Sequence, residues 1–158
     1  MPALGDRECY RLVKPIDVGP VLPLLDRLPF FSAGNSSAEK YKCDVLLKSQ
    51  FPSELAELLP SLGLGGDLAR AVLRRLGPRQ SIPPHTDKWM PAEADWRRFQ
   101  LPLVTDPGIV MRWPDDGQEV HLQAGHLYEV RFDRTHEVVN DWGGERIHLQ
   151  IDQVNATI

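Results

Sequence analysis

Short runs of strand-forming residues, separated by turn residues, occupy the chain from Arg98 to Asp152. Asp-Pro-Gly at 106–108, Pro-Asp-Asp-Gly at 114–117 and Trp-Gly-Gly at 142–144 mark the turns. Short strands at regular spacing are typical of a β-sandwich or a small barrel, so this pattern predicts a mainly β fold with a jelly-roll-like core. The expected strands are 98–105, 109–113, 119–123, 126–132, 136–140 and 146–152.

The first third of the chain mixes helical and extended patterns, which predicts a small N-terminal α/β extension. The expected elements are strands at 8–13 and 41–49 and helices at 18–28 and 52–62. In the second helix Ser53 is the predicted N-cap and Glu57 the first-turn acid.

Residues 68–76, with the sequence LARAVLRRL, are ambiguous. Their intrinsic propensity favours a helix. A Gly-Pro turn and the proline-containing segment IPPHTD follow directly, and these favour a strand that leads into an extended segment.

At 158 residues the chain is long enough to form one domain with its own hydrophobic core. We find no repeat or linker that divides it. The extension is expected at about 1–65 and the β core at about 66–152 of a single domain.

Composition excludes several classes of partner. The net charge of −4 and the dispersed Lys and Arg residues give no reason to expect nucleic acid or an anionic membrane. Cys9 and Cys43 form no CxxC pair, and no signal peptide or membrane span is evident, so a cytoplasmic protein is expected. Nothing in the sequence specifies an oligomeric state.

The segment IPPHTD (82–87) contains a histidine and an aspartate one residue apart. In extended chain, residues i and i+2 point to the same face, so His85 and Asp87 are expected to converge. His136, at the start of another expected strand, is the candidate third ligand. Two histidines and one carboxylate on one face of an octahedron suit non-haem Fe(II).

Arg146 follows ten residues after His136 on the next expected strand. A guanidinium pairs bidentately with a carboxylate, so this position favours an anionic ligand. A lone histidine in a strand is usually an ordinary half-buried residue. The combination of two histidines, Asp87 and Arg146 is what favours a functional site.

This combination resembles the 2-oxoglutarate/Fe(II)-dependent oxygenases, and in finer detail the aspartyl/asparaginyl β-hydroxylase family, including its proline-hydroxylase-like members. The matching stretches are IPPHTD, RRFQLPLVTDPGI, AGHLYEVRFDRTHEVVND and ERIHLQID. The resemblance implies a double-stranded β-helix in which His85, Asp87 and His136 hold iron. It also implies that 68–76 is a strand.

The resemblance further implies that Arg146 binds the distal carboxylate of 2-oxoglutarate and that Arg98 and Gln100 help to hold this cosubstrate. His148, two residues after Arg146, should face the same way, beside the cosubstrate or as a core histidine. Weaker candidates for lining the substrate pocket are Trp89, Arg97, Trp113 and Asn140.

The implied activity is hydroxylation of an unactivated C–H bond, using Fe(II), 2-oxoglutarate and O₂, with release of succinate and CO₂. The substrate would be an amino acid, or an Asp or Asn residue in a peptide. One departure weakens the peptide analogy: the best-known membrane-anchored members lack the carboxylate that Asp87 provides. A small natural-product intermediate also remains open as the substrate.

Two other functions compete with this one. A cupin-like metalloenzyme that does not use 2-oxoglutarate would share the jelly roll, although Asp87 and Arg146 argue against it. A non-catalytic binding or sensor module on the same fold would hold a ligand without consuming O₂.

Overall fold

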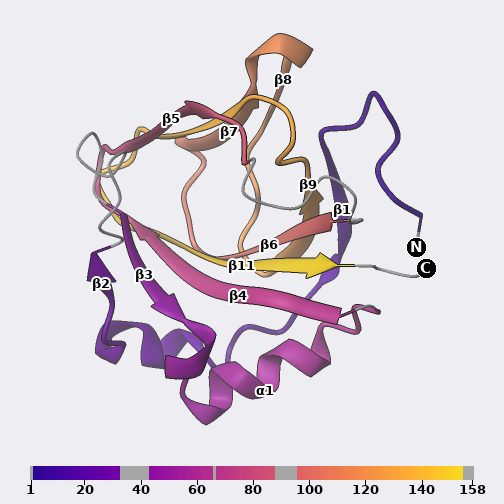
Figure 1. Cartoon of the computed structure of the whole chain (residues 1–158). Helices are drawn as coiled ribbons and strands as arrows, with labels where there is room; N and C mark the ends of the chain where they lie inside the picture. The colour runs from indigo at the N-terminus through magenta and orange to yellow at the C-terminus, as the bar shows by residue number, and fades with distance from the viewer. Residues whose placement is uncertain (1, 33–42, 66, 88–95, 155–158) are drawn as a thin grey trace.

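The computed structural model describes residues 2–32, 43–65, 67–87 and 96–154. Over these residues the chain forms two antiparallel β-sheets, one of seven strands and one of four. In Figure 1 the larger sheet crosses the middle of the molecule, with helix α1 below it and the strands of the smaller sheet above it.

The larger sheet carries strands from both ends of the chain. From edge to edge its order is β1 (Tyr10–Pro15), β9 (His126–Val130), β6 (Trp96–Val104), β11 (Arg146–Val154), β4 (Asp67–Leu76), β3 (Cys43–Leu47) and β2 (Phe31–Ser32).

The smaller sheet has the order β5 (Ser81–His85), β10 (His136–Asn140), β7 (Ile109–Trp113) and β8 (Gln118–Val120). Here β10 pairs with β5 on one side and with β7 on the other. The extended approach predicted for IPPHTD is therefore confirmed, because residues 81–85 form an edge strand of this sheet.

The predicted β core is confirmed by the structure. The segment 68–76 lies in β4, so its helix propensity is overridden. Its pairing with both β11 and β3 explains the override, since a central strand gains ladder hydrogen bonds and packing on both sides. β8 is shorter than expected and ends at Val120.

In the described residues the helical elements are α1 (Ser53–Ser61) and the 3₁₀ helices η1 (Leu22–Arg27), η3 (Lys48–Gln50) and η4 (Pro114–Asp116). The helix expected at 18–28 is thus a shorter 3₁₀ helix. The capping prediction was wrong by one residue: Pro52 is the N-cap of α1, and Ser53 is its first helical residue. Glu54, rather than Glu57, is the acid in the first turn.

Strand β11 shows how the larger sheet separates apolar from polar contacts. Ile147, Leu149 and Ile151 point to one face, where they join a core with α1 and η1. We call this the outer face of the sheet. The alternate residues occupy the opposite, inner face, which looks towards the smaller sheet: Arg146, His148, Gln150 and Asp152.

A second apolar cluster lies between the two sheets and includes Leu76, Ile109, Met111, Trp113 and Val138. The polar side chains on the inner face of β11 are themselves buried. The buried polar side chains of β11 therefore lie in an interior of mixed character, where each needs a partner.

Cys9 and Cys43 are free and buried. None of the helices in the described parts of the chain is long and apolar enough to cross a membrane. The cytoplasmic location and the division into extension and core stay predictions.

Candidate active site

His85 and His136 come together because β5 and β10 are paired. Their Cα atoms are direct partners in the ladder, and their ring centroids lie 4.4 Å apart. Asp87 follows two residues after His85 and is anchored by its backbone N–H, which donates to Phe132 O at 3.1 Å. One possible ligand atom from each of His85, Asp87 and His136 lies within 4.8 Å of the others.

Backbone hydrogen bonds orient both imidazoles. His85 Nδ1 lies 2.7 Å from Pro83 O, and His136 Nδ1 lies 2.7 Å from Arg134 O. A carbonyl accepts, so each Nδ1 carries the hydrogen and each Nε2 keeps its lone pair. Both Nε2 atoms lie 3.7 Å from a carboxylate oxygen of Asp87. This is the arrangement of metal-binding histidines, in which a partner on the other ring nitrogen fixes the tautomer.

The ionisation states also suit a cation. Burial opposes ionisation of Asp87, but the Arg98 guanidinium beside it outweighs burial and holds the pKa of this carboxyl below its ordinary value. Burial lowers the pKa of His136. A neutral imidazole at His136 and an ionised carboxylate at Asp87 suit the donor set of a facial triad.

Arg98 lies between two carboxylates. Its Nη1 donates to Asp87 Oδ2, while Nε and Nη2 donate to Asp152 at 2.7 and 3.2 Å. Burial opposes its charge, yet Asp152 and Asp87 together raise the pKa of Arg98 above its ordinary value. All three nitrogens are thus used within the protein.

A small cavity lies between the sheets, next to the triad along β10. Val138, two residues after His136 and on the same face of the strand, lines it. Arg146 and His148 of β11 line it from the larger sheet, and Thr105 lies at the end of β6. The other residues around it are apolar or on the smaller sheet: Ile109, Val110, Met111 and Leu122.

Three buried polar atoms around this cavity have no hydrogen-bond partner among the described residues: Arg146 Nε, His148 Nε2 and Thr105 Oγ1. Arg146 is 3% exposed, and no carboxylate of the described residues forms an ion pair with it. Burial lowers its pKa to about 10. A buried guanidinium without a counterion is costly, so the cavity is built for an anion.

Gln100 acts on this cavity through His148. Its Oε1 lies 3.2 Å from His148 Nδ1, and its Nε2 donates to Gln150 Oε1 at 3.4 Å. The same Gln150 oxygen accepts from Arg74 Nε at 3.2 Å. Burial, followed by Arg146 and His121, lowers the pKa of His148 well below its ordinary value, so this imidazole is neutral near pH 7.

The weaker candidates in the described residues make other contacts. Arg97 is on the outer face of β6, bonded to Glu129, because neighbouring residues of a strand point to opposite faces. Trp113 is fully buried, stacks on Tyr10 and donates its indole N–H to Arg131 O at 3.2 Å. Trp89 lies outside the described residues.

Asn140 stabilises the turn after β10. Its amide nitrogen donates to Gly77 O and Gly144 O, and its oxygen accepts from the Trp142 N–H. These bonds use the side chain's principal groups and join the turn to the segment before β5.

Two functional candidates escaped the sequence analysis. Thr105 is the last residue of the strand predicted at 98–105, and nothing in the sequence marks its hydroxyl as buried. Asp152 had a visible signal: polar residues recur at every second position from Arg146, which indicates a polar face on an otherwise apolar strand.

The family model described as aspartyl/asparaginyl β-hydroxylase matches residues 47–156. A comparison with curated proteins gives no match.

Three solved structures illustrate the similarity of fold. A viral collagen prolyl hydroxylase from Paramecium bursaria Chlorella virus-1 has a TM-score of 0.65 at 10% identity, over 96% of this chain and 99% of that one. HygX from Streptomyces hygroscopicus, with nickel and 2-oxoglutarate bound, has a TM-score of 0.67 at 10% identity, over 97% and 85%. A prolyl-4-hydroxylase from Pseudomonas putida has a TM-score of 0.58 at 16% identity, over 92% and 91%.

The double-stranded β-helix and its His-Asp-His cluster define an enzyme of the Fe(II)- and 2-oxoglutarate-dependent oxygenase class. Within that class, the chain belongs to the aspartyl/asparaginyl β-hydroxylase family. The resemblance found in the sequence is thereby confirmed, together with the predicted fold and enzyme class.

Proposed function

We propose that this protein hydroxylates an unactivated C–H bond of an amino acid, or of an Asp or Asn residue in a peptide. His85, Asp87 and His136 hold Fe(II), and 2-oxoglutarate binds beside them with its distal carboxylate at Arg146. The observation that carries the proposal is Arg146, a buried guanidinium without a counterion among the described residues. It lines a cavity that also contacts Val138, two residues after His136 on β10.

The residues around both groups fit them. The two Nε2 lone pairs and the Asp87 carboxylate supply a facial donor set, and their orientation is fixed before a metal arrives. When bound, Fe(II) with 2-oxoglutarate and O₂ supplies the oxidising chemistry, and succinate and CO₂ are the co-products.

Arg146 is assigned to the distal carboxylate of the cosubstrate. Its planar fork pairs bidentately with a carboxylate, and that pairing would neutralise the buried charge. The Thr105 hydroxyl, also without a partner, donates to the same carboxylate. The apolar residues opposite, Ile109 and Met111, exclude water and strengthen both interactions.

His148 and Gln100 shape the wall of this cavity. The chain of hydrogen bonds from Arg74 through Gln150 and Gln100 places the hydrogen on His148 Nδ1, so the neutral imidazole packs beside the cosubstrate without adding charge. Arg98 contributes positive charge next to the triad while it is bonded to Asp87 and Asp152.

The amino-acid or peptidyl substrate is supported by the family to which the chain belongs. The retained Asp87 favours a free amino acid over a peptide, because the best-known members that lack this carboxylate act on peptides. The cupin-like alternative is less well supported, because 2-oxoglutarate accounts for both the cluster that contains Asp87 and the buried guanidinium of Arg146.

The test is a screen of amino acids and of Asp- or Asn-containing peptides with Fe(II), 2-oxoglutarate and O₂. Succinate and a product heavier by one oxygen atom are measured together. The proposal expects both to form in equal amounts with one substrate class, and to disappear in Asp87→Ala. Oxidised product without consumption of 2-oxoglutarate would instead support the cupin-like enzyme. Ligand binding without consumption of O₂ would support a binding module.

A further inference from the structure

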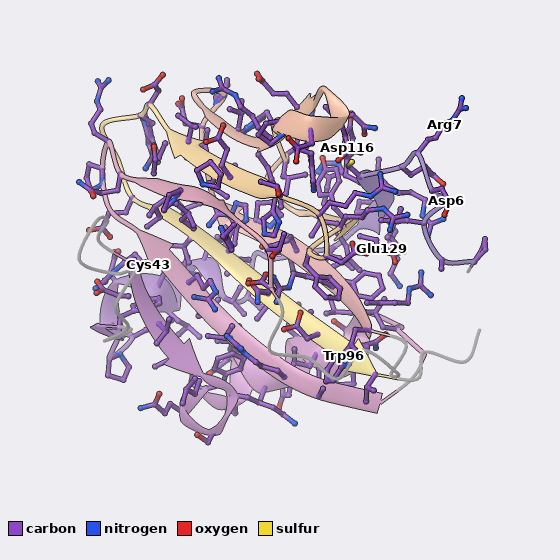
Figure 2. The ribbon with its side chains drawn as sticks, turned by 45° about the horizontal axis from the view of Figure 1, so that its top comes forward. Asp6, Arg7, Cys43, Trp96, Asp116 and Glu129 are labelled. Atoms are coloured by element: carbon purple, nitrogen blue, oxygen red, sulfur yellow. The ribbon has the colours of Figure 1, made fainter. Side chains whose placement is uncertain are left out.

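Asp152 is a completely buried carboxylate on the inner face of the larger sheet. It lies directly opposite Arg98 on β6 and opposite Arg70 on β4. Trp96 of β6 and Cys43 of β3 mark the two ends of β11 in Figure 2, and they lie far apart. The pair of Arg98 and Asp152 lies near the Trp96 end, and Arg146 lies near the Cys43 end. Asp152 is therefore remote from the cosubstrate cavity and close to the triad.

Arg98 divides its hydrogen bonds between Asp152 and Asp87. Asp152 accepts from Nε and Nη2, which form one side of the guanidinium fork, and this leaves Nη1 for Asp87 Oδ2. Phe132 supports the arrangement twice. Its ring lies 5.1 Å from the guanidinium carbon of Arg98, and its carbonyl oxygen accepts the Asp87 N–H.

This division matters because a guanidinium with a free edge pairs bidentately with a carboxylate. If Asp152 did not occupy that edge, Arg98 would take both oxygens of Asp87 and compete with a metal for them. With the edge occupied, one nitrogen contacts one oxygen of Asp87, and Oδ1 stays directed to the side of His85.

We propose that Asp152 is a positioning residue of the metal centre: it restrains Arg98 to a single contact with Asp87 and so keeps one oxygen of that carboxylate available to the metal. The inference rests on the proposed role of Asp87 as a metal ligand. It does not depend on which substrate is hydroxylated.

The chain provides a matched control on the other side of the same strand. Arg97, the neighbour of Arg98, bonds Glu129 through Nε at 2.8 Å and Nη2 at 2.5 Å, and Glu129 is 3% exposed. This buried pair is on the outer face of the sheet, and in Figure 2 Glu129 lies by the N-terminal segment. Glu129→Gln thus removes a comparable buried charge that lies on the face of the sheet opposite to the triad.

The experiment titrates the metal-free protein with Mn(II) and follows the free ion by EPR. Asp152→Asn is expected to weaken Mn(II) binding by about 10–100-fold, as loss of outer-shell partners of metal ligands typically does. Glu129→Gln is expected to lower the Tm but to bind Mn(II) within about threefold of the wild type, well inside that range.

A rescue variant separates positioning from general destabilisation. In Asp152→Asn/Arg98→Gln the competing guanidinium is gone, so Mn(II) affinity should recover to within about threefold of the wild type. A merely structural role predicts no recovery. If Asp152→Asn does not fold, Arg98→Lys replaces it and is expected to weaken Mn(II) binding as well. A lysine has one nitrogen, so Asp152 cannot restrain it through one nitrogen while a second one contacts Asp87.

Wild-type affinity in Asp152→Asn, or in Arg98→Lys where that variant is used, would overturn the inference. So would an equal loss of affinity in Glu129→Gln. If the wild-type protein itself bound no Mn(II), the assignment of the triad would fail, and the positioning role would fail with it. The first two results leave the proposed function intact, so the two failures are distinguishable.

Discussion

His85 and His136 are direct partners across the β5–β10 ladder, and their Nε2 atoms each lie 3.7 Å from an oxygen of Asp87. The ladder fixes the two backbones, and the carbonyls of Pro83 and Arg134 fix the rings. The ligands are therefore held in place by the fold itself. Such preorganisation means that a metal can bind without rearrangement of the sheet.

Removal of the carboxylate should disable the centre. Asp87→Ala is expected to reduce turnover by more than the roughly 10–100-fold that is typical of outer-shell substitutions. The reason is that two imidazoles alone hold the metal weakly and in the wrong geometry. The measurement is succinate formation at saturating 2-oxoglutarate, together with Mn(II) affinity. Unchanged affinity in Asp87→Ala would remove Asp87 from the ligand set.

Arg146→Met should raise the stability of the protein and abolish its binding of 2-oxoglutarate. The substitution removes a buried uncompensated charge, so the protein without cosubstrate should gain on the order of 1 kcal/mol or more in free energy of unfolding. It should also lose the binding of 2-oxoglutarate, because the counterion of the distal carboxylate is gone.

Urea unfolding and isothermal titration with 2-oxoglutarate measure these two effects. Arg112→Met is the control, since Arg112 forms an exposed pair with Glu119 and its loss should change stability by less than about 0.5 kcal/mol. A destabilised Arg146→Met that still binds 2-oxoglutarate normally would contradict the assignment.

Addition of 2-oxoglutarate should stabilise the wild-type protein. A ligand at 100 times its dissociation constant contributes about 2.7 kcal/mol to the free energy of unfolding. The increase in Tm should be absent in Arg146→Met. A larger increase with a molecule that lacks the distal carboxylate would argue against the proposed orientation of the cosubstrate.

Thr105→Val tests the unpartnered hydroxyl of the cavity. Valine keeps the shape of threonine and removes one hydrogen bond, which is worth about 0.5–1.5 kcal/mol. The KM for 2-oxoglutarate should therefore rise roughly 2–10-fold with little change in kcat. If kcat fell while KM stayed constant, Thr105 would act on another step.

Acidification should destabilise the metal-free protein through its buried histidines. Burial lowers the pKa of His136 and His148 in the folded state, so below about pH 6.5 the unfolded chain takes up protons that the native protein does not. The free energy of unfolding should fall as the pH drops, by up to about 1.4 kcal/mol per pH unit for each histidine.

Urea unfolding between pH 7.5 and pH 5.5 measures this dependence. His148→Gln should make the decline shallower. An identical decline in His148→Gln and the wild type would refute the contribution of His148.

Most strands could be predicted from the sequence, because each depends on local alternation. The structure brings His85, Asp87 and His136 together as expected, and the roles of these residues and of Arg146 stay predictions. Period-two alternation indicated most strands, and His85 and Asp87 converge because residues i and i+2 of extended chain share a face. The same rule could have separated Arg98 from Arg97, which the structure places on opposite faces of β6.

Other features depend on contacts between distant segments, which spacing does not encode. The bidentate pair of Asp152 and Arg98 depends on the register between β6 and β11. The contact of Thr105 with the cavity depends on how the smaller sheet is placed against the larger one. Ser53 was predicted as an N-cap from residue preference alone. The proline before it already adopts the extended conformation of a cap.

The most direct test of the account follows the fate of 2-oxoglutarate labelled at C1, in air, with the Fe(II)-loaded protein and ascorbate, which supplies the two electrons that reduce the second oxygen atom when no substrate is present. We predict release of labelled CO₂ and an equal amount of unlabelled succinate. Arg112→Met should release both at the wild-type rate, and Asp87→Ala and Arg146→Met should release neither. An Fe(II)-loaded wild-type protein that leaves 2-oxoglutarate unchanged, or an Asp87→Ala variant that consumes it at the wild-type rate, would contradict the account.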